Sequence, residues 1–150
     1  MAISLPGLSM PESDSSHAVE GLATIPSRFG PKETVDRLEA QIQAKGLTVF
    51  ARIDHAAGAV EAGLLLAPTE LIIFGNARGG TPLMQSVQTV GIDLPLKALV
   101  WEDASGKTWL SYNEPNWIAQ RHGVHNAQAV LNKMADLLTT ISTQATTPNE

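Results

Sequence analysis

Hydrophobic and polar residues follow two different periods in the first third of the chain. Apolar residues first recur at spacings of three and four, at Val35, Leu38 and Ile42. This spacing predicts a helix that begins at Pro31, a residue suited to the first turn, and stops at Gly46. From Leu47 to Ile53, apolar and polar residues alternate instead, which is typical of a half-buried strand. The pattern therefore predicts a helix that leads directly into a strand.

Three more segments carry strand signals. The continuous apolar run Leu71–Phe74 predicts a strand in the middle of a sheet, buried on both faces. Residues 96–101 and 108–112 flank Asp103-Ala104-Ser105-Gly106, a turn sequence that predicts a β-hairpin. A further short strand is predicted over Gly21–Ile25.

Capping residues predict three further helices. Thr81 offers an N-cap hydroxyl and Pro82 suits the first helical position, so a short helix is expected before Gly91. A second short helix is expected from Pro115 to His122, ended by Gly123. Asn126 is the predicted N-cap of a longer final helix. The apolar face of that helix consists of Val130, Met134, Leu137, Leu138 and Ile141.

The order β-α-β-β-α-β-β-α-α predicts a single α+β domain. We expect a mixed, mostly antiparallel sheet of about five strands with helices packed mainly on one face. A chain of 150 residues is long enough to bury one core without covalent links. Residues 1–17 are expected to form a flexible leader, 18–143 the domain, and 144–150 a flexible tail, because both ends are polar and lack periodicity.

Composition excludes several classes of function. The chain has no cysteine, which excludes disulfides, thiolate metal sites and cysteine nucleophiles. Its formal net charge is -5 and its ten Lys and Arg residues form no run, so no nucleic-acid partner is expected. The N-terminus lacks the pattern of a signal peptide, and the apolar stretch 56–67 is interrupted and too short to span a bilayer. We expect a cytoplasmic protein without a membrane partner.

Five short motifs occur in a fixed order along the chain. They are Asp54–Ala59, Phe74–Asn76 ahead of Gly80–Met84, Asp93–Lys97, Val100–Asp103 and Trp109–Asn113. Together they resemble the bacterial and archaeal family called domain of unknown function 302 (DUF302), over about residues 20–143. The resemblance implies an α+β domain that forms a homodimer and has no established activity or ligand. Ala77 departs from the family pattern, in which proline often follows Gly-Asn.

His55 is the first candidate for a functional side chain. It directly follows the predicted strand, beside Asp54 and in a loop that Gly58 is expected to open. An imidazole there could act as a general acid or base, or donate a hydrogen bond to a ligand carboxylate or carbonyl. The alternative is structural: His55 hydrogen-bonds a backbone carbonyl and helps to turn the chain.

The segment from Gly75 to Thr81, which includes Asn76, is a candidate anion site. It links a predicted strand to a helix N-terminus, where unpaired N–H groups and the helix dipole favour a carboxylate or phosphate. The segment lacks the P-loop ending and the dinucleotide-binding spacing. The alternative is a tight crossover with Asn76 in a left-handed turn.

Aromatic residues around the hairpin supply further candidates. Trp101 and Tyr112 could line a pocket or a dimer interface, or simply fill the core. Glu102 continues the first hairpin strand and could face a site or solvent. His122 and His125 are three residues apart, but Gly123 interrupts their helix, so neither a metal site nor a cofactor is expected.

These observations leave three functional hypotheses. The first is a homodimeric small-molecule-binding or sensing domain, with a ligand site built from His55, Asn76, Thr81, Trp101, Glu102 and Tyr112. The second is a small enzyme in which His55 acts as acid or base, assisted by Asp54, Glu102 or Tyr112. The third is a purely structural or protein-interaction module.

Overall fold

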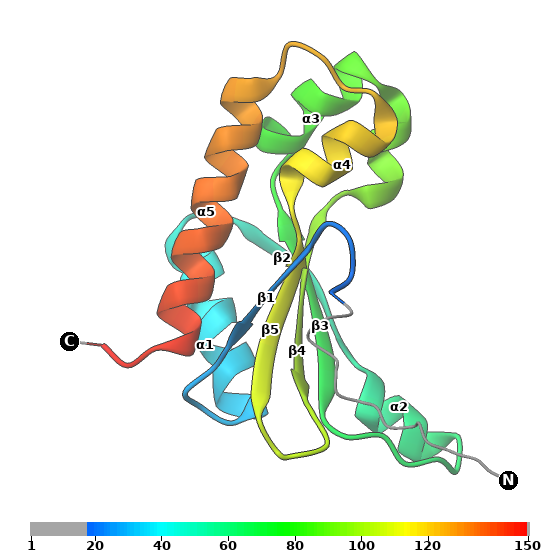
Figure 1. Cartoon of the computed structure of the whole chain (residues 1–150), viewed down its shortest axis with the longest axis vertical. Coiled ribbons are helices and arrows are strands. Elements are labelled where there is room, and N and C mark those ends of the chain that lie inside the picture. The colour runs from blue at the N-terminus through cyan, green and yellow to red at the C-terminus, as the bar shows by residue number, and fades with distance from the viewer. Residues whose placement is uncertain (1–17, 150) are drawn as a thin grey trace, which may run out of the picture.

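Five strands form one antiparallel sheet in the computed structural model, which describes residues 18–149 (Figure 1). The strands are β1 (Leu22–Pro26), β2 (Thr48–Asp54), β3 (Thr69–Gly75), β4 (Leu96–Glu102) and β5 (Thr108–Asn113). Their order across the sheet is β1-β5-β4-β3-β2, and every neighbouring pair is antiparallel. The predicted strands and the α+β class are confirmed, and the sheet contains no parallel pair among the described strands.

Six helical segments accompany the sheet within residues 18–149. They are α1 (Pro31–Ala44), α2 (His55–Glu61), α3 (Ala77–Ser86), the 3-10 helix η3 (Gln88–Asp93), α4 (Pro115–His122) and α5 (Gln128–Thr146). Helix α2 was not predicted, because Gly58 was taken as a loop signal and instead lies inside the helix. The carboxylate of Asp54 caps α2 by accepting the N–H of Ala57 at 2.9 Å, which compensates for the weak helix propensity of glycine.

The core lies between one face of the sheet and helices α1 and α5. Ile72 and Phe74 of β3 are fully buried on this face. On the opposite face of the same strand, Leu71 and Ile73 are only half-buried. The prediction that this strand is buried on both faces was therefore wrong: an apolar run shows that both faces of a strand are apolar, not that helices cover both.

Two helix starts differ from the prediction. Helix α3 begins at Ala77 because the side chain of Asn76 caps it, accepting the N–H of Gly79 at 2.7 Å. Thr81 and Pro82 consequently lie inside the helix instead of at its start. Helix α5 begins at Gln128, one position later than Asn126 would allow as its N-cap, because Asn126 adopts a left-handed backbone with φ of 60°.

The final helix also extends further than the predicted domain boundary. It runs to Thr146, three residues into the segment 144–150 for which a flexible tail was expected. Ala145 is fully buried, and the carbonyl of Thr146 accepts the N–H of Arg28 at 2.8 Å. The end of α5 is therefore hydrogen-bonded to the segment between β1 and α1. The predicted leader, residues 1–17, lies outside the described residues.

The second face of the sheet, here called the open face, carries Leu71, Ile73, Leu99, Trp101 and Trp109. The strand register places Leu71 beside Leu99 and Trp101 beside Trp109. All five side chains are half-buried, and within residues 18–149 helices α1 and α5 pack on the opposite face. The open face is thus an apolar surface flanked by the edge strands β1 and β2.

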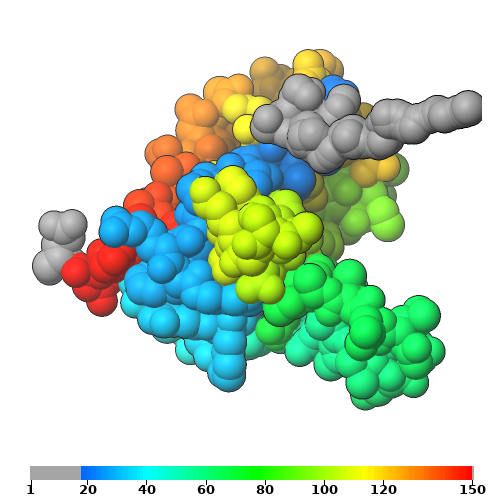
Figure 2. Space-filling model, turned by 60° about the horizontal axis from the view of Figure 1, so that its bottom comes forward, coloured from blue at the N-terminus to red at the C-terminus, as the bar shows by residue number. Residues whose placement is uncertain are grey.

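Residues 55–68, here called the arm, comprise α2 and the loop that follows it. The arm stands away from the rest of the molecule (Figures 1 and 2). Four of its large hydrophobic residues are exposed: Val60 64%, Leu64 64%, Leu65 95% and Leu66 49%. This concentration of exposed apolar side chains is unusual for a surface loop of a monomer. None of the helices in the described part of the chain is both long and apolar enough to cross a membrane.

Candidate functional site

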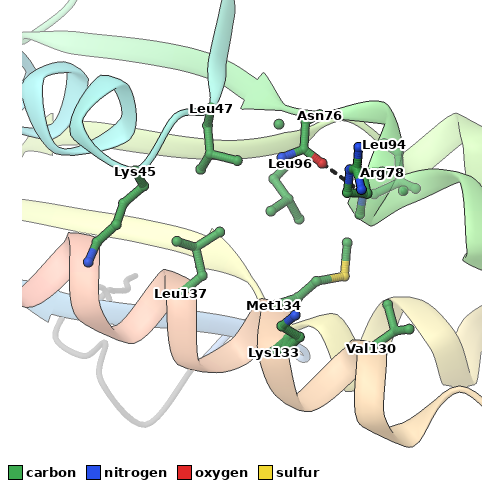
Figure 3. A pocket seen from close by; sticks show the side chains of 13 residues that line it. Lys45, Leu47, Asn76, Arg78, Leu94, Leu96, Val130, Lys133, Met134 and Leu137 are labelled. Atoms are coloured by element: carbon green, nitrogen blue, oxygen red, sulfur yellow. Dashed lines mark hydrogen bonds between the residues drawn. The ribbon is translucent and has the colours of Figure 1, made fainter.

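A cavity of about 480 Å³ lies between α5, the start of α3 and the adjoining ends of β2, β3 and β4 (Figure 3). Its lining residues are Lys45, Leu47, Gly75, Asn76, Arg78, Gly79, Gly80, Leu94, Leu96, Val130, Lys133, Met134 and Leu137. Ligand pockets for small organic molecules span about 300–1,000 Å³, so this cavity has a suitable size. We call it the cationic pocket, because Lys45, Arg78 and Lys133 are among its lining residues.

The floor of the cationic pocket is apolar. One side of α5 contributes Val130, Met134 and Leu137, which share a helix face because they are three or four residues apart. Leu47 and Leu96 face them from the starts of β2 and β4, and these side chains converge in Figure 3. The sequence predicted this apolar face of α5. Met134 belongs to the buried core, Val130 and Leu137 pack against it, and all three also line the cavity.

Three cationic side chains surround this floor. Lys45, Arg78 and Lys133 line the pocket, and its lining residues include no carboxylate. Within residues 18–149, none of the three forms an ion pair. Figure 3 shows Lys45 and Arg78 at opposite ends of the drawn side chains, with Leu47, Leu96 and Leu137 between them. A chain with a net charge of -5 therefore gathers three positive charges around one cavity.

The N-terminus of α3 adds hydrogen-bond donors at one end of the cationic pocket. Asn76 uses its side-chain oxygen to cap Gly79, so its amide N–H₂ remains available as a donor. Ala77 and Arg78 are the first two helical residues, and their backbone N–H groups have no acceptor within the helix. Asn76 itself has an extended backbone, with φ of -153°, so the predicted left-handed turn was wrong.

Glycine forms the wall of the cationic pocket at this turn. A Cβ added to Gly79 would lie 3.2 Å from the capping oxygen of Asn76, and one added to Gly80 would lie 3.4 Å from Leu94 Cδ1. Both distances are tight, so side chains at these positions would press on the cap and on the apolar lining. The two glycines leave the backbone accessible at the end of the cavity.

The other predicted site residues lie in separate regions. His55 is exposed at the start of the arm, and the Asp54 carboxylate bonds the backbone of α2 instead of the imidazole. Tyr112 packs against the core, while Glu102 lies at the hairpin end of β4. Thr81 is exposed on α3 and does not line the cationic pocket. Of the six predicted ligand residues, the pocket contains Asn76.

The two hairpin tryptophans have their polar atoms satisfied within the chain. Trp101 Nε1–H donates to Ser111 at 2.9 Å, and Trp109 Nε1–H donates to Asp103 at 2.8 Å. The bond from Trp109, together with bonds from Lys107 and Ser105, holds the pKa of Asp103 well below its usual range. The rings stack with centroids 6.2 Å apart. What they present on the open face is apolar ring surface.

A hydrogen-bonded cluster joins α4 to η3. His122 Nε2 lies 2.6 Å from Asp93, and its Nδ1 lies 2.9 Å from the hydroxyl of Thr89. Arg121 donates to both carboxylate oxygens of Asp93, at 2.8 and 2.9 Å. Burial disfavours the charged form of Asp93, but the bonds from His122 and Arg121 outweigh burial and lower its pKa.

Replacing Asp93 with asparagine is expected to destabilise the protein in a pH-dependent way. A lowered pKa stabilises the folded state above the ordinary value of 3.8, and this contribution disappears as the pH falls through the folded value. We expect a loss of about 1–3 kcal/mol at neutral pH, typical of hydrogen bonds to a charged group. Urea unfolding of both proteins should show the difference shrinking between pH 5 and pH 2. A constant difference over this range would assign the loss to packing.

Curated proteins from three Brucella species match part of this chain. Those of Brucella suis biovar 1 (strain 1330) and Brucella abortus biovar 1 are named fluoride-specific ion channel FluC 1, and that of Brucella melitensis biotype 1 is named FluC 2. Each is 57% identical over 104 residues, which is 69% of this chain. The match covers 41% of the first protein and 38% of the other two, so the chain spans about two-fifths of their length.

A solved structure shares the fold. It is the crystal structure of an uncharacterized conserved protein DUF302 from Bacillus stearothermophilus, with a TM-score of 0.76 and 19% sequence identity. The similarity covers 85% of this chain and 99% of that one. The sequence pattern of the family described as domain of unknown function DUF302 matches residues 23–141. The resemblance noted in the short motifs is thereby confirmed, and this chain is a member of the DUF302 family.

Proposed function

We propose that the protein is a homodimeric small-molecule-binding domain whose ligand site is the cationic pocket. The observation that carries this proposal is a cavity of about 480 Å³ with an apolar floor, three cations and no carboxylate. The three cations are exposed and solvated, and together they create a positive potential around a concave apolar surface, which attracts a ligand of opposite charge. His55 takes no part in this site, so the proposal does not depend on acid or base catalysis.

Filling the cationic pocket should abolish ligand binding. Val130 is half-buried in its lining, and a tryptophan in its place would occupy the cavity. In native mass spectrometry of untagged protein, we expect bound extra mass on the wild type and none on Val130→Trp. The matched control is Ala129→Trp, at an exposed neighbouring position of α5 outside the lining, which should retain the extra mass. Equal extra mass on all three proteins would place the ligand elsewhere and contradict the proposal.

The homodimer is supported by the open face and the arm. Both are apolar, and in residues 18–149 each is left without a covering element. A second copy related by a two-fold axis would meet each surface twice, because such an interface is self-complementary. The apolar character of both surfaces suits a stable interface, whose buried centre is more apolar than ordinary protein surface.

Charge also favours a second copy on these surfaces. The arm contains Glu61 and no lysine or arginine, and Asp54 stands at its base. The open face carries Lys97 in its register, and Lys107 lies with its Nζ 4.8 Å from the centre of the Trp109 ring, whose Nε1–H donates to Asp103. The two cations outnumber this one carboxylate. An acidic, apolar arm therefore complements a basic, apolar sheet face. We propose that two copies associate through these surfaces.

A second candidate ligand for the cationic pocket is fluoride. Its support is the name of the Brucella relatives, together with the N–H groups at the start of α3, which suit a small anion. Sodium fluoride titrated into ¹⁵N-labelled protein tests it. Saturable shifts confined to Asn76–Gly80, absent with sodium chloride, would support fluoride recognition. Identical spectra with both salts would remove this candidate.

A further inference from the structure

We infer that the ligand of the cationic pocket is an amphipathic anion, with one carboxylate or phosphate head and a flexible apolar body. This inference rests on the proposed function and specifies the chemical class of the ligand. The lining divides into two chemically different parts, and each part selects one half of such a molecule.

The start of α3 is suited to the anionic head. Arg78 offers a guanidinium whose paired N–H groups match a carboxylate or phosphate in a bidentate arrangement. The backbone N–H groups of Ala77 and Arg78 and the free amide of Asn76 lie at the same turn. A cation and several neutral N–H donors therefore lie at one end of the cavity. There they can replace the water molecules that an anion loses when it binds.

The apolar floor is suited to a flexible hydrocarbon body. Leu47, Leu96 and Leu137 form its middle, and Met134 lies beside them (Figure 3). Methionine has an unbranched and adaptable side chain, so this surface can adjust to a chain of variable shape. Leu96 and Met134 are already buried, whereas Leu47 and Leu137 are half-buried, so a head group alone would leave their exposed parts in water. An alkyl chain covers them and contributes through the hydrophobic effect.

The two lysines exclude the other classes of amphipathic ligand. Lys45 and Lys133 line the same cavity as Arg78, and no lining carboxylate offsets them. A cationic ligand would be repelled by all three groups. A neutral ligand would gain nothing from these three exposed cations, because it carries no charge for them to attract. An anion is the class that gains from all three cations.

A panel of eight-carbon ligands tests this inference. Octanoate and octyl phosphate carry the two anionic heads, octanol is neutral, octylammonium is cationic, and acetate is a head without a body. Titration calorimetry at low salt should show binding of octanoate or octyl phosphate at least about tenfold tighter than octanol, the effect of one charged hydrogen bond. The comparison of octanoate with octyl phosphate identifies the head. Acetate and octylammonium should not bind measurably.

Matched charge variants locate the head. Arg78→Gln should weaken binding of the anionic ligand by about tenfold or more. Lys32→Gln removes one positive charge from an exposed lysine of α1 that is outside the pocket, and should leave binding unchanged. Equal weakening by both variants would show that only the overall charge acts, and would overturn the assignment of Arg78.

The outcomes separate this inference from the proposed function. Octanol bound as tightly as octanoate, and lost in Val130→Trp, would refute an anionic ligand while leaving the cationic pocket as the binding site. Failure of the whole panel, with extra mass still bound to the wild type and absent from Val130→Trp, would do the same. Binding of octanoate that persists in Val130→Trp would place the ligand outside the cationic pocket. It would therefore refute both the proposed ligand site and the assignment of an amphipathic anion to it.

Discussion

Replacing Leu65 with aspartate is expected to convert a dimer of this protein into a monomer. Leu65 is 95% exposed within one copy, so the substitution removes almost no contact inside the chain and should not unfold it. In the proposed dimer the same side chain is covered by the second copy, and a buried unpaired carboxylate costs several kcal/mol. Size-exclusion chromatography with light scattering should give twice 15.9 kDa for the wild type and 15.9 kDa for Leu65→Asp.

The control for this experiment is Ile92→Asp. Ile92 is also a large exposed hydrophobic residue, at 74%, but it lies on η3, outside both the arm and the open face. This variant should remain a dimer, with a circular dichroism spectrum equal to those of the wild type and Leu65→Asp. A wild-type monomer would contradict the proposed assembly. Loss of the dimer in both variants would show that dimerisation does not depend specifically on the arm.

Alanine in place of Gly21 is expected to cause the second large effect, a loss of about 2–5 kcal/mol of stability. Gly21 has φ of +77°, and a Cβ there would overlap the indole ring of Trp117. The left-handed backbone costs an alanine about 1–2 kcal/mol. Displacing a packed ring adds about 1–3 kcal/mol. The carbonyl of Gly21 also accepts the N–H of Glu114 at 2.8 Å, so the chain cannot move away without losing this bond.

Gly46→Ala separates the two contributions. Gly46 has the same φ of +77°, but a Cβ there would meet no atom within 4 Å. It should therefore cost only the backbone term of about 1–2 kcal/mol. Urea unfolding of the wild type and both variants measures the comparison. Equal losses in the two variants would show that the contact with Trp117 is unimportant, and the ring moves aside freely.

The sequence predicts elements well where a signal is local. Alternation from Leu47 to Ile53 and the turn residues Asp103–Gly106 correspond to β2 and to the β4–β5 hairpin. Predictions failed where a neighbouring side chain decided the outcome. The Asn76 carboxamide starts α3 before Thr81, and the Asp54 carboxylate holds α2 together despite Gly58. In α3 an earlier cap, Asn76, replaces the predicted cap Thr81, and in α2 a cap outweighs the weak helix propensity of Gly58.

The cationic pocket was only partly predictable for a different reason. Asn76 was identified because strand-to-helix turns favour anions wherever they occur. Lys45 and Lys133 were not, because they lie 88 positions apart in the sequence and line one cavity only in the folded chain. Lys133 does lie between the predicted apolar positions Val130 and Met134 of α5. A charged residue on an apolar helix face was the available signal for a site there.

The pairing of β1 with β5 also bears on the order in which the chain can fold during synthesis. Thr24 and Ser111, whose hydroxyl oxygens lie 2.8 Å apart, are 87 positions apart in the sequence. Strands β2, β3 and β4 pair in succession as they emerge, whereas β1 is made before them and must wait for β5. Contacts of such long sequence separation slow folding. A nascent chain that ends before Thr108 therefore holds three paired strands and leaves the first strand without its partner.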